Sequence, residues 1–214
     1  MDHIYDVLAF RAVDEIDLCK QYLAGHIKVL TDYDIVNITS NNQSWIKNPN
    51  IYCLGLFTCS QELIGGIRIQ LADGKHMLPI EDAIGNMEKN INNIVKLYAL
   101  NGGIAELSGL WVDKRLRGLG VGCYLVRAAI ASSSQLNFKT MIGICGDVTL
   151  KLFNDVGFVV DVNIGNKGRF LYPNKDLIAY LVGILNAISL ESAAEYDKSI
   201  MYSLRKKKTT KNRK

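Results

Sequence analysis

The sequence predicts an α/β fold in which a mixed β-sheet carries helices on both faces. Apolar residues alternate with period 2 in several short segments and recur at helical spacing in others. A glycine-rich turn joins one of these strands to the helix that follows it. With 214 residues, of which 49% are hydrophobic, the chain is long enough for one domain with a substantial core.

The predicted elements follow one another in the order expected for such a sheet. Strands are predicted at 4–12, 51–59, 63–71, 104–112, 139–145, 157–164 and 169–172. Helices are predicted at 14–30, 86–99, 119–136, 147–156 and 175–203. The remainder of 73–103 favours loops, because it contains Pro79 and several asparagines.

Residues 104–122 form the most informative stretch of the chain. Alternate positions of 104–112 read as a strand, and Arg117-Gly-Leu-Gly-Val-Gly122 then opens a helix. Glycines at 118, 120 and 122 allow backbone N–H groups to turn toward a ligand without interference from a Cβ atom. Together with the positive end of the helix dipole and the charge of Arg117, these groups predict a binding site for phosphates.

The spacing of these glycines excludes two common phosphate motifs. It does not fit the dinucleotide fingerprint G-x-G-x-x-G, and no Gly-Lys-Ser/Thr of a P-loop follows. The pattern Arg-x-x-Gly-x-Gly after a strand ending in Leu-x-Val resembles instead the GNAT superfamily of N-acyltransferases. The resemblance is specific over about 104–160 and extends more loosely over 1–173 through the order of elements.

The resemblance implies a GNAT-like domain over 1–204, with 73–103 as an insert of unclear structure. Such a domain has a mostly antiparallel sheet of about seven strands, in which the parallel strands 104–112 and 139–145 splay apart to admit the arm of coenzyme A. It implies acetyl-CoA, or another acyl-CoA or acyl carrier protein, as donor. The pyrophosphate-binding residues would be Arg117, Gly118, Leu119, Gly120, Val121 and Gly122.

The same resemblance assigns the acyl end of the donor to strand 104–112. Gly109 is a candidate β-bulge that would redirect the neighbouring backbone groups. In the family, the amide of a residue just past such a bulge polarises the thioester carbonyl. The candidates here are Leu110 and Val112, with Trp111 between them.

Glu106 is the candidate catalytic base. It lies eleven residues before Arg117, the spacing at which histone-type members of the family have a glutamate base. A carboxylate within an apolar strand should have a raised pKa, which suits proton abstraction. The alternatives are a solvent-facing strand end and a structural ion pair with Arg68 or Arg127.

The family's usual proton donor to the leaving thiolate, a tyrosine, is replaced here. The segment 147–158 ends in the expected Gly157-Phe158, but Phe153 stands in the place of the tyrosine. The thiolate then leaves unaided or through water, or Tyr124 or Tyr172 serves, or activity is lost. Cys145 ends a strand, where packing against the arm is a more common role than nucleophilic attack.

The leading functional hypothesis is transfer of an acetyl group from acetyl-CoA to a primary amine of a small molecule or peptide, by direct attack on the thioester. A second resemblance, to N-acyl amino acid synthases and acyl-homoserine-lactone synthases, is carried by 65–70, 78–81 and 106–112, although Gly109 breaks their Glu-x-Ser-Arg pattern. Those relatives take a fatty acyl chain from acyl carrier protein. The third hypothesis is a catalytically silent acyl-CoA-binding module.

Charge and cysteine content limit the partners. The last ten residues carry seven Lys/Arg and no acid, so 205–214 reads as a disordered basic tail on a body of net charge about −3. The five scattered cysteines predict a reducing cytoplasm and no metal site. No aromatic interleaving supports nucleic-acid binding. The apolar run 176–190 is too short for a membrane span, and we interpret it as a buried helix or a homodimer interface.

Overall fold

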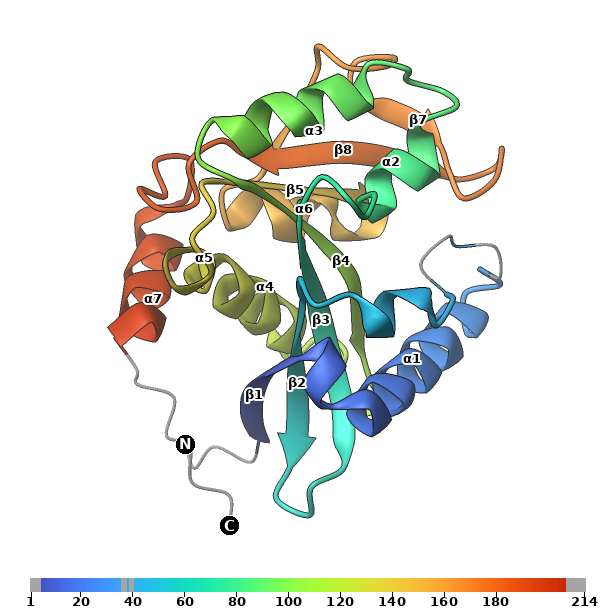
Figure 1. The fold of residues 1–214 in the computed structure, drawn as a ribbon. Coiled ribbons are helices and arrows are strands. Elements are labelled where there is room, and N and C mark those ends of the chain that lie inside the picture. Colours follow the sequence, from blue (N-terminus) through green and yellow to red (C-terminus); the bar gives the residue numbers. More distant parts are fainter. Residues whose placement is uncertain (1–4, 36–37, 39–40, 207–214) are drawn as a thin grey trace.

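The computed structural model describes residues 5–35, 38 and 41–206. Its strands form one eight-stranded sheet, with helices on both faces (Figure 1). The strands are β1 (Tyr5–Arg11), β2 (Ile51–Thr58), β3 (Leu63–Leu71), β4 (Ile104–Val112), β5 (Thr140–Gly146), β6 (Val159–Val160), β7 (Arg169–Leu171) and β8 (Ile178–Ile184). The α-helices are α1 (Ile16–Thr31), α2 (Pro79–Ile84), α3 (Ile91–Leu100), α4 (Val121–Ala131), α5 (Ser133–Leu136), α6 (Asp147–Asp155) and α7 (Glu195–Lys206). Single 3₁₀ turns are η1 (Ala12–Asp14), η2 (Ser44–Lys47) and η3 (Lys114–Leu116).

The sheet is mixed and mostly antiparallel, as the sequence predicts. The strand order is β1-β2-β3-β4-β5-β8-β6, with β7 also paired to β8. Within the described residues β4 and β5 make the one parallel pair, and their register runs only from Ile104 opposite Thr140 to Leu107 opposite Gly143. Both strands continue beyond that point without pairing with each other, while β4 stays paired to β3 and β5 to β8. The predicted splay of the parallel pair is therefore confirmed, and it opens the sheet at its centre.

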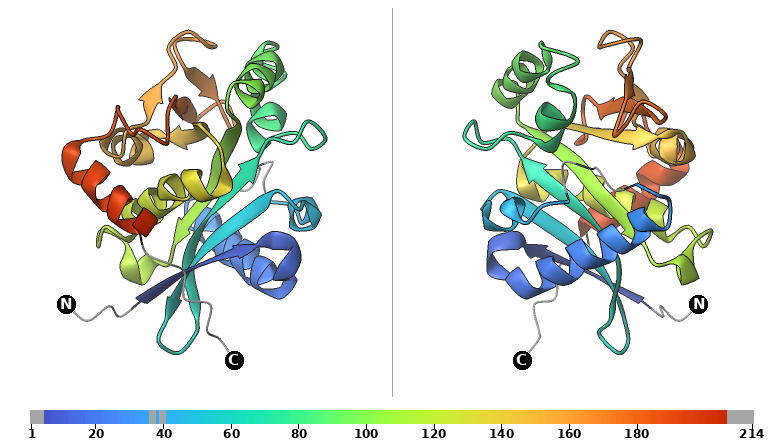
Figure 2. Two further views of the ribbon diagram at one scale, coloured as in Figure 1. Left: turned by 60° about the vertical axis from the view of Figure 1, so that its left-hand side comes forward. Right: turned by 90° about the vertical axis from the view of Figure 1, so that its right-hand side faces the viewer.

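Each face of the sheet has its own core. On one face, Leu125 and Ala129 of α4, Phe153 of α6 and Met201 of α7 join a large apolar cluster against β2–β5. On the other face, α2 and α3 pack over β5 and β8, and α1 packs over β2 and the end of β4. Figure 2 shows α4 and α7 on one side of the sheet and α1, α2 and α3 on the other.

The final predicted helix, 175–203, is wrong in its first half. Residues 178–184 form β8, which pairs with β5 on one side and with β6 and β7 on the other. A short apolar run buried on both faces gives no period that separates a strand from a helix. Because β8 explains this run, the run gives no ground for a homodimer. Helix α7 begins only at Glu195.

Other boundaries also differ from the predictions, and the helix predicted at 86–99 begins only at Ile91. Pro79 does not mark a loop but takes the first turn of α2, where its missing N–H is harmless, and Glu81 caps the backbone N–H of Leu78. Helix 119–136 breaks after Ala131, because the Ser132 hydroxyl donates to the Ala129 carbonyl. Strand 157–164 shortens to β6.

The predicted tail starts too early. Arg205 and Lys206 form the last turn of α7, and Arg205 donates hydrogen bonds to the carbonyls of Ala187 and Ile188. The rest of the predicted tail, 207–214, lies outside the described residues, as do residue 4 of the first predicted strand and parts of the loop before η2.

Candidate active site

A cavity of about 200 Å³ lies where β4 and β5 separate. Its floor comes from the two strands, and its walls come from α1, α2 and α6. Most of the lining is apolar, and Glu106 is the carboxylate among the described lining residues. The lining residues are His26, Leu30, Ile38, Ile67, Pro79, Ala83, Glu106, Leu107, Ser108, Gly109, Leu110, Ile144, Cys145, Gly146, Thr149, Phe153 and Tyr172.

Glu106 lies at the point where the parallel pair is still closed. It is opposite Gln70 of β3 and Ile142 of β5, and its side chain is 3% exposed. The Ile80 N–H, in the first turn of α2, donates to Oε2 at 2.7 Å. Burial raises the pKa of Glu106 to about 8, although this hydrogen bond and the nearby charge of Arg68 act in the opposite direction. The solvent-facing alternative is thus wrong, and so is an ion pair with Arg127, which pairs with Asp197.

The predicted β-bulge is present at Gly109. The register between β3 and β4 shifts so that Gly109 and Leu110 together oppose Ile67, and Gly109 has φ +61°. A Cβ atom here would lie 2.9 Å from the Tyr22 hydroxyl, which donates a hydrogen bond to the Gly109 carbonyl. Glycine is required at this position for both its conformation and its small size.

Beyond the bulge, alternate backbone groups face opposite sides of β4. The Asp113 N–H donates to the Ile64 carbonyl of β3, so the backbone of Trp111 also faces β3. The N–H of Val112 therefore faces the opening left by β5. Leu110 lines the cavity itself, whereas Val112 does not.

Trp111 is not available to a donor, in contrast to the sequence prediction. Its side chain is 5% exposed and packs edge-on against Tyr22, with ring centroids 6.0 Å apart. The indole also fills the space over Gly25 of α1, where a Cβ atom would come within 2.3 Å of it. Trp111 holds α1 against the sheet, because the bulge at Gly109 shifts the alternation and turns this side chain to the α1 face.

The glycine turn and α4 have the geometry of an anion site. Gly118 and Gly120 have φ +80° and +75°, and no atom lies within 4 Å of a Cβ built on either. Gly120 is the N-cap of α4, and no side chain caps this end of the helix. The first N–H groups of the helix, from Val121 onward, therefore point outward without an intrahelical partner. Leu119 is 65% exposed at the tip of the turn.

Arg117 is already engaged with α1. Its guanidinium lies 3.0 Å from the Asp32 carboxylate and 5.0 Å from the centre of the Tyr33 ring. These contacts tether the glycine turn to the C-terminal end of α1. The positive charge that the sequence predicts at Arg117 is thus partly neutralised by Asp32.

Residues 117–122 do not line the cavity, so the predicted anion site at the surface is separate from the buried Glu106. The gap between β4 and β5 lies between the two sites. β4 ends at Val112, and η3 then leads to the glycine turn. A long, thin ligand with an anionic end would be needed to reach both.

The residues considered as proton donor or nucleophile differ in their surroundings. Phe153 packs edge-on against Phe158, with ring centroids 5.0 Å apart. Burial raises the pKa of the Cys145 thiol to about 12, so this cysteine is not a thiolate at neutral pH. Tyr172 lines the cavity, whereas Tyr124 does not.

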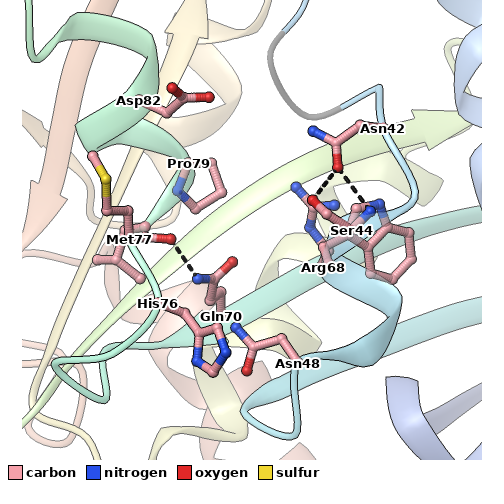
Figure 3. A pocket seen from close by; sticks show the side chains of 11 residues that line it. Asn42, Ser44, Asn48, Arg68, Gln70, His76, Met77, Pro79 and Asp82 are labelled. Carbon is pink, nitrogen blue, oxygen red and sulfur yellow. Dashed lines mark hydrogen bonds between the residues drawn. The ribbon is translucent and has the colours of Figure 1, made fainter.

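The sequence prediction missed a second cavity, of about 260 Å³, beside the first (Figure 3). Both cavities share Pro79 as a wall. Arg68 and Gln70 of β3 line the second cavity and are 2% and 3% exposed. The signal was in the sequence: two polar residues on the same face of an otherwise apolar strand are unusual unless they have a partner or a function.

No metal site or membrane segment is found in the described part of the chain. No group of three or more His, Cys, Asp or Glu side chains is arranged to hold a metal ion there. Among the described helices, none has the length and apolar character needed to cross a membrane.

Comparison with known proteins shows the family of this chain. Residues 18–158, more than half of the chain, match the family described as the acetyltransferase (GNAT) family. No curated protein sequence matches the chain.

Solved structures share the fold at low sequence identity. FeeM, an N-acyl amino acid synthase from uncultured soil microbes, has 15% identity and a TM-score of 0.67, covering 91% of this chain and 97% of its own. ElaA of Escherichia coli has 10% identity and a TM-score of 0.60, with 84% and 98% covered. BjaI, a CoA-dependent acyl-homoserine lactone synthase solved with SAM and isopentyl-CoA, has 13% identity and a TM-score of 0.57, with 93% and 88% covered.

Proposed function

Because this chain belongs to the GNAT family of acetyltransferases, we propose that it transfers an acyl group from acyl-CoA to a primary amine, with Glu106 as the catalytic base. The observation that carries this proposal is the position of Glu106, a buried carboxyl group lining the cavity where β4 and β5 part. A thioester whose arm lies between the strands would present its carbonyl to this carboxylate.

The proposed reaction needs one proton removed from the acceptor before bond formation. Ionised Glu106 takes a proton from the ammonium group, directly or through one water. The neutral amine then attacks the thioester carbonyl carbon, the tetrahedral intermediate collapses, and the C–S bond breaks. The acyl group ends in the amide, the amide nitrogen gives its second proton to the departing thiolate, and Glu106 releases the first proton to water. The proposed oxyanion donors are the backbone N–H groups of Leu110 and Val112 on β4.

The donor is proposed to lie with its pyrophosphate on the turn 118–122 and its arm along the open edge of β4. The outward N–H groups at the start of α4 and the guanidinium of Arg117 support this orientation. Tyr172, which lines the same cavity, is the proposed proton donor to the thiolate in place of Phe153. In this first candidate function, the proposed donor is acetyl-CoA.

A second candidate keeps the mechanism and changes the acyl chain. The cavity walls at Leu30, Ile67, Ala83 and Ile144 are apolar, which suits a longer chain carried by CoA or acyl carrier protein. FeeM, an N-acyl amino acid synthase, and BjaI, an acyl-homoserine lactone synthase, share the fold of this chain. A silent acyl-CoA-binding module is the weaker alternative, because such a module has no need of a buried carboxyl group with a raised pKa. The cytoplasm is the proposed location, since all five cysteines are free thiols.

The test is acyl transfer from acetyl-CoA and from long-chain acyl-CoA to a panel of amines, followed by mass spectrometry. Wild type should acylate at least one amine, and Glu106→Gln should lower kcat by roughly 10²–10⁴-fold while leaving the KM for the donor unchanged. A Glu106→Gln protein as fast as wild type excludes Glu106 as the base. If wild type neither binds nor uses any of these donors, the transferase function itself is refuted.

A further inference from the structure

A buried guanidinium lies next to Glu106 without a carboxylate partner. Arg68 is 2% exposed, and its Nε donates to the Ser108 hydroxyl at 3.2 Å. The Arg68 guanidinium also lies 4.7 Å from the centre of the Trp45 ring. No carboxylate of the described residues comes within 4.0 Å of it. Burying an arginine charge with only a hydroxyl and a ring as partners is unfavourable unless another group completes the site.

This guanidinium lines the 260 Å³ cavity rather than the tight interior of a core. Figure 3 shows Arg68 beside Ser44 and Asn42, with Gln70 and His76 further along the cavity. The uncharged side chains of Ser44, Asn42 and Gln70 thus line the same cavity as the charge, and the walls at Met77 and Pro79 are apolar. The carboxylate of Asp82 also lines the cavity, and the Asp82 residue is exposed.

The register of the sheet puts Arg68 and Glu106 on one face. Arg68 is opposite Ser108, and Gln70 is opposite Glu106, so Arg68 and Glu106 are diagonal neighbours, with Cα atoms about 7–8 Å apart in such pairs. Glu106 lines the donor cavity and Arg68 lines the neighbouring one. The two cavities meet at Pro79, so a small molecule that spans both would contact Arg68 and Glu106.

We propose that the acceptor is an amine that also carries a carboxylate, such as an α-amino acid, and that Arg68 binds this carboxylate. The proposal rests on the acyltransferase function proposed above and specifies its second substrate. With the carboxylate on the guanidinium fork, the amine, one carbon away, faces the carboxyl group of Glu106. The apolar wall at Met77 and Pro79 then takes the substrate's side chain.

Two features of the site favour a carboxylate over a neutral group. Planar guanidinium groups match carboxylates with two parallel hydrogen bonds, and an arginine stays charged at any relevant pH. Glu106 is a poor counter-charge for Arg68, because burial disfavours the ionised form of its carboxyl group and its Oε2 already accepts a hydrogen bond from the Ile80 N–H. Substrate carboxylate and Arg68 would therefore neutralise each other within the site.

The test compares amino acids with the same molecules lacking the carboxylate, for example leucine with isopentylamine. Binding of all twenty amino acids and their decarboxylated amines is measured by calorimetry with desulfo-CoA present, and acyl transfer is measured by mass spectrometry. At least one amino acid should bind roughly tenfold or more tightly than its amine. Arg68→Gln should abolish this preference, and Arg68→Lys, which keeps the charge but not the fork, should restore part of it.

A matched control removes another guanidinium. Arg115→Gln takes away an exposed arginine that pairs with Asp113 and Glu62, and it should leave the preference unchanged. The melting temperature of each variant checks that it is folded, and the comparison of ligands on wild type needs no variant at all.

The outcomes separate this proposal from the proposed function. Acylation of amines with no preference for a carboxylate, or a preference that survives Arg68→Gln, overturns the role of Arg68 while the acyltransferase stands. Absence of binding by every amino acid overturns it as well. Arg68-dependent binding of amino acids by a protein that uses no acyl donor would support the binding site and refute the transferase.

Discussion

Glu106 and Arg68 are both buried, and burial changes the properties of each ionisable group. The carboxyl group of Glu106 is enclosed by sheet and helix, and desolvation raises its pKa to about 8. Burial lowers the pKa of His26 to about 4, and the charge of Arg68 on the same sheet face contributes to this shift. The site therefore holds a neutral histidine, a cation and a carboxyl group that titrates near the physiological range.

Burial of Glu106 should make the stability of the protein depend on pH. Its pKa is raised on folding from 4.5 to about 8, so the folded state favours the protonated form, and stability is lost as pH rises through this interval. Each pKa unit corresponds to about 1.4 kcal/mol. Glu106→Gln removes the ionisable group and keeps an acceptor for the Ile80 N–H.

We therefore expect Glu106→Gln to raise the melting temperature relative to wild type more at pH 9 than at pH 5. Calorimetry at both pH values measures the difference. A difference that is constant over this range contradicts the raised pKa, whatever the result of the activity assay.

These residue roles were only partly predictable from the sequence. Glu106 was recognisable from its distance to the glycine turn and from its apolar strand. The role of Arg68 was not, because its position depends on the pairing of β3 with β4, which no local pattern contains. Trp111 was misassigned because a single bulge at Gly109 reverses the side-chain alternation beyond it.

At the scale of elements, the strand–turn–helix unit of β4 and α4 could be read directly. The period-2 strand, the three glycines and the helical spacing after Val121 are local signals, and the structure agrees with them. β8 could not be read in this way, because a run that is apolar on both faces has no diagnostic period. The contact between the glycine turn and α1 was also beyond prediction, since Arg117 and Asp32 are far apart in the chain.

Substituting each partner of the Arg117–Asp32 ion pair tests whether Arg117 binds the pyrophosphate of the donor. Arg117→Ala should weaken acyl-CoA binding by roughly tenfold or more, because a charge-assisted hydrogen bond to phosphate is lost. Asp32→Ala should leave binding unchanged or strengthen it, because it frees the same guanidinium for the ligand. Calorimetry with CoA measures both.

If both variants weaken binding equally, the pair acts by tethering the turn to α1, and Arg117 does not bind the pyrophosphate. Melting temperatures distinguish a loss of binding from a loss of folding. The pair is about 40% exposed, so neither variant should lower stability by more than about 1 kcal/mol.

At the scale of the whole molecule, the strands form one continuous sheet that opens at its centre, where β4 and β5 separate. Antiparallel strands β1–β4 and β5–β8 are joined only by the short parallel pair, and helices close both faces. Helix α7 lies at the edge of the molecule beside α4 (Figure 1), and its Asp197 pairs with Arg127 of α4 at 2.5 Å. The predicted order of elements agrees with the strands through β7 but lacks α2, and because β8 was predicted as part of a helix, the beginning of α7 was placed too early.

The end of α7 predicts where the chain can be shortened. Deletion of 207–214 leaves all described contacts of Arg205 in place, and we expect an unchanged melting temperature and unchanged acyl-CoA binding. Deletion of 205–214 also removes the hydrogen bonds from Arg205 to Ala187 and Ile188, and it should lower the melting temperature by several degrees. Equal melting temperatures for the two deletions would contradict the part assigned to Arg205.

The most direct test of the proposed site is a crystal structure of the protein with CoA bound. We predict that the diphosphate lies on the N–H groups of 118–122, with the arm running along the open edge of β4 toward Glu106. A structure in which CoA occupies another surface, or in which the opening between β4 and β5 stays closed to it, would contradict the assignment of this site.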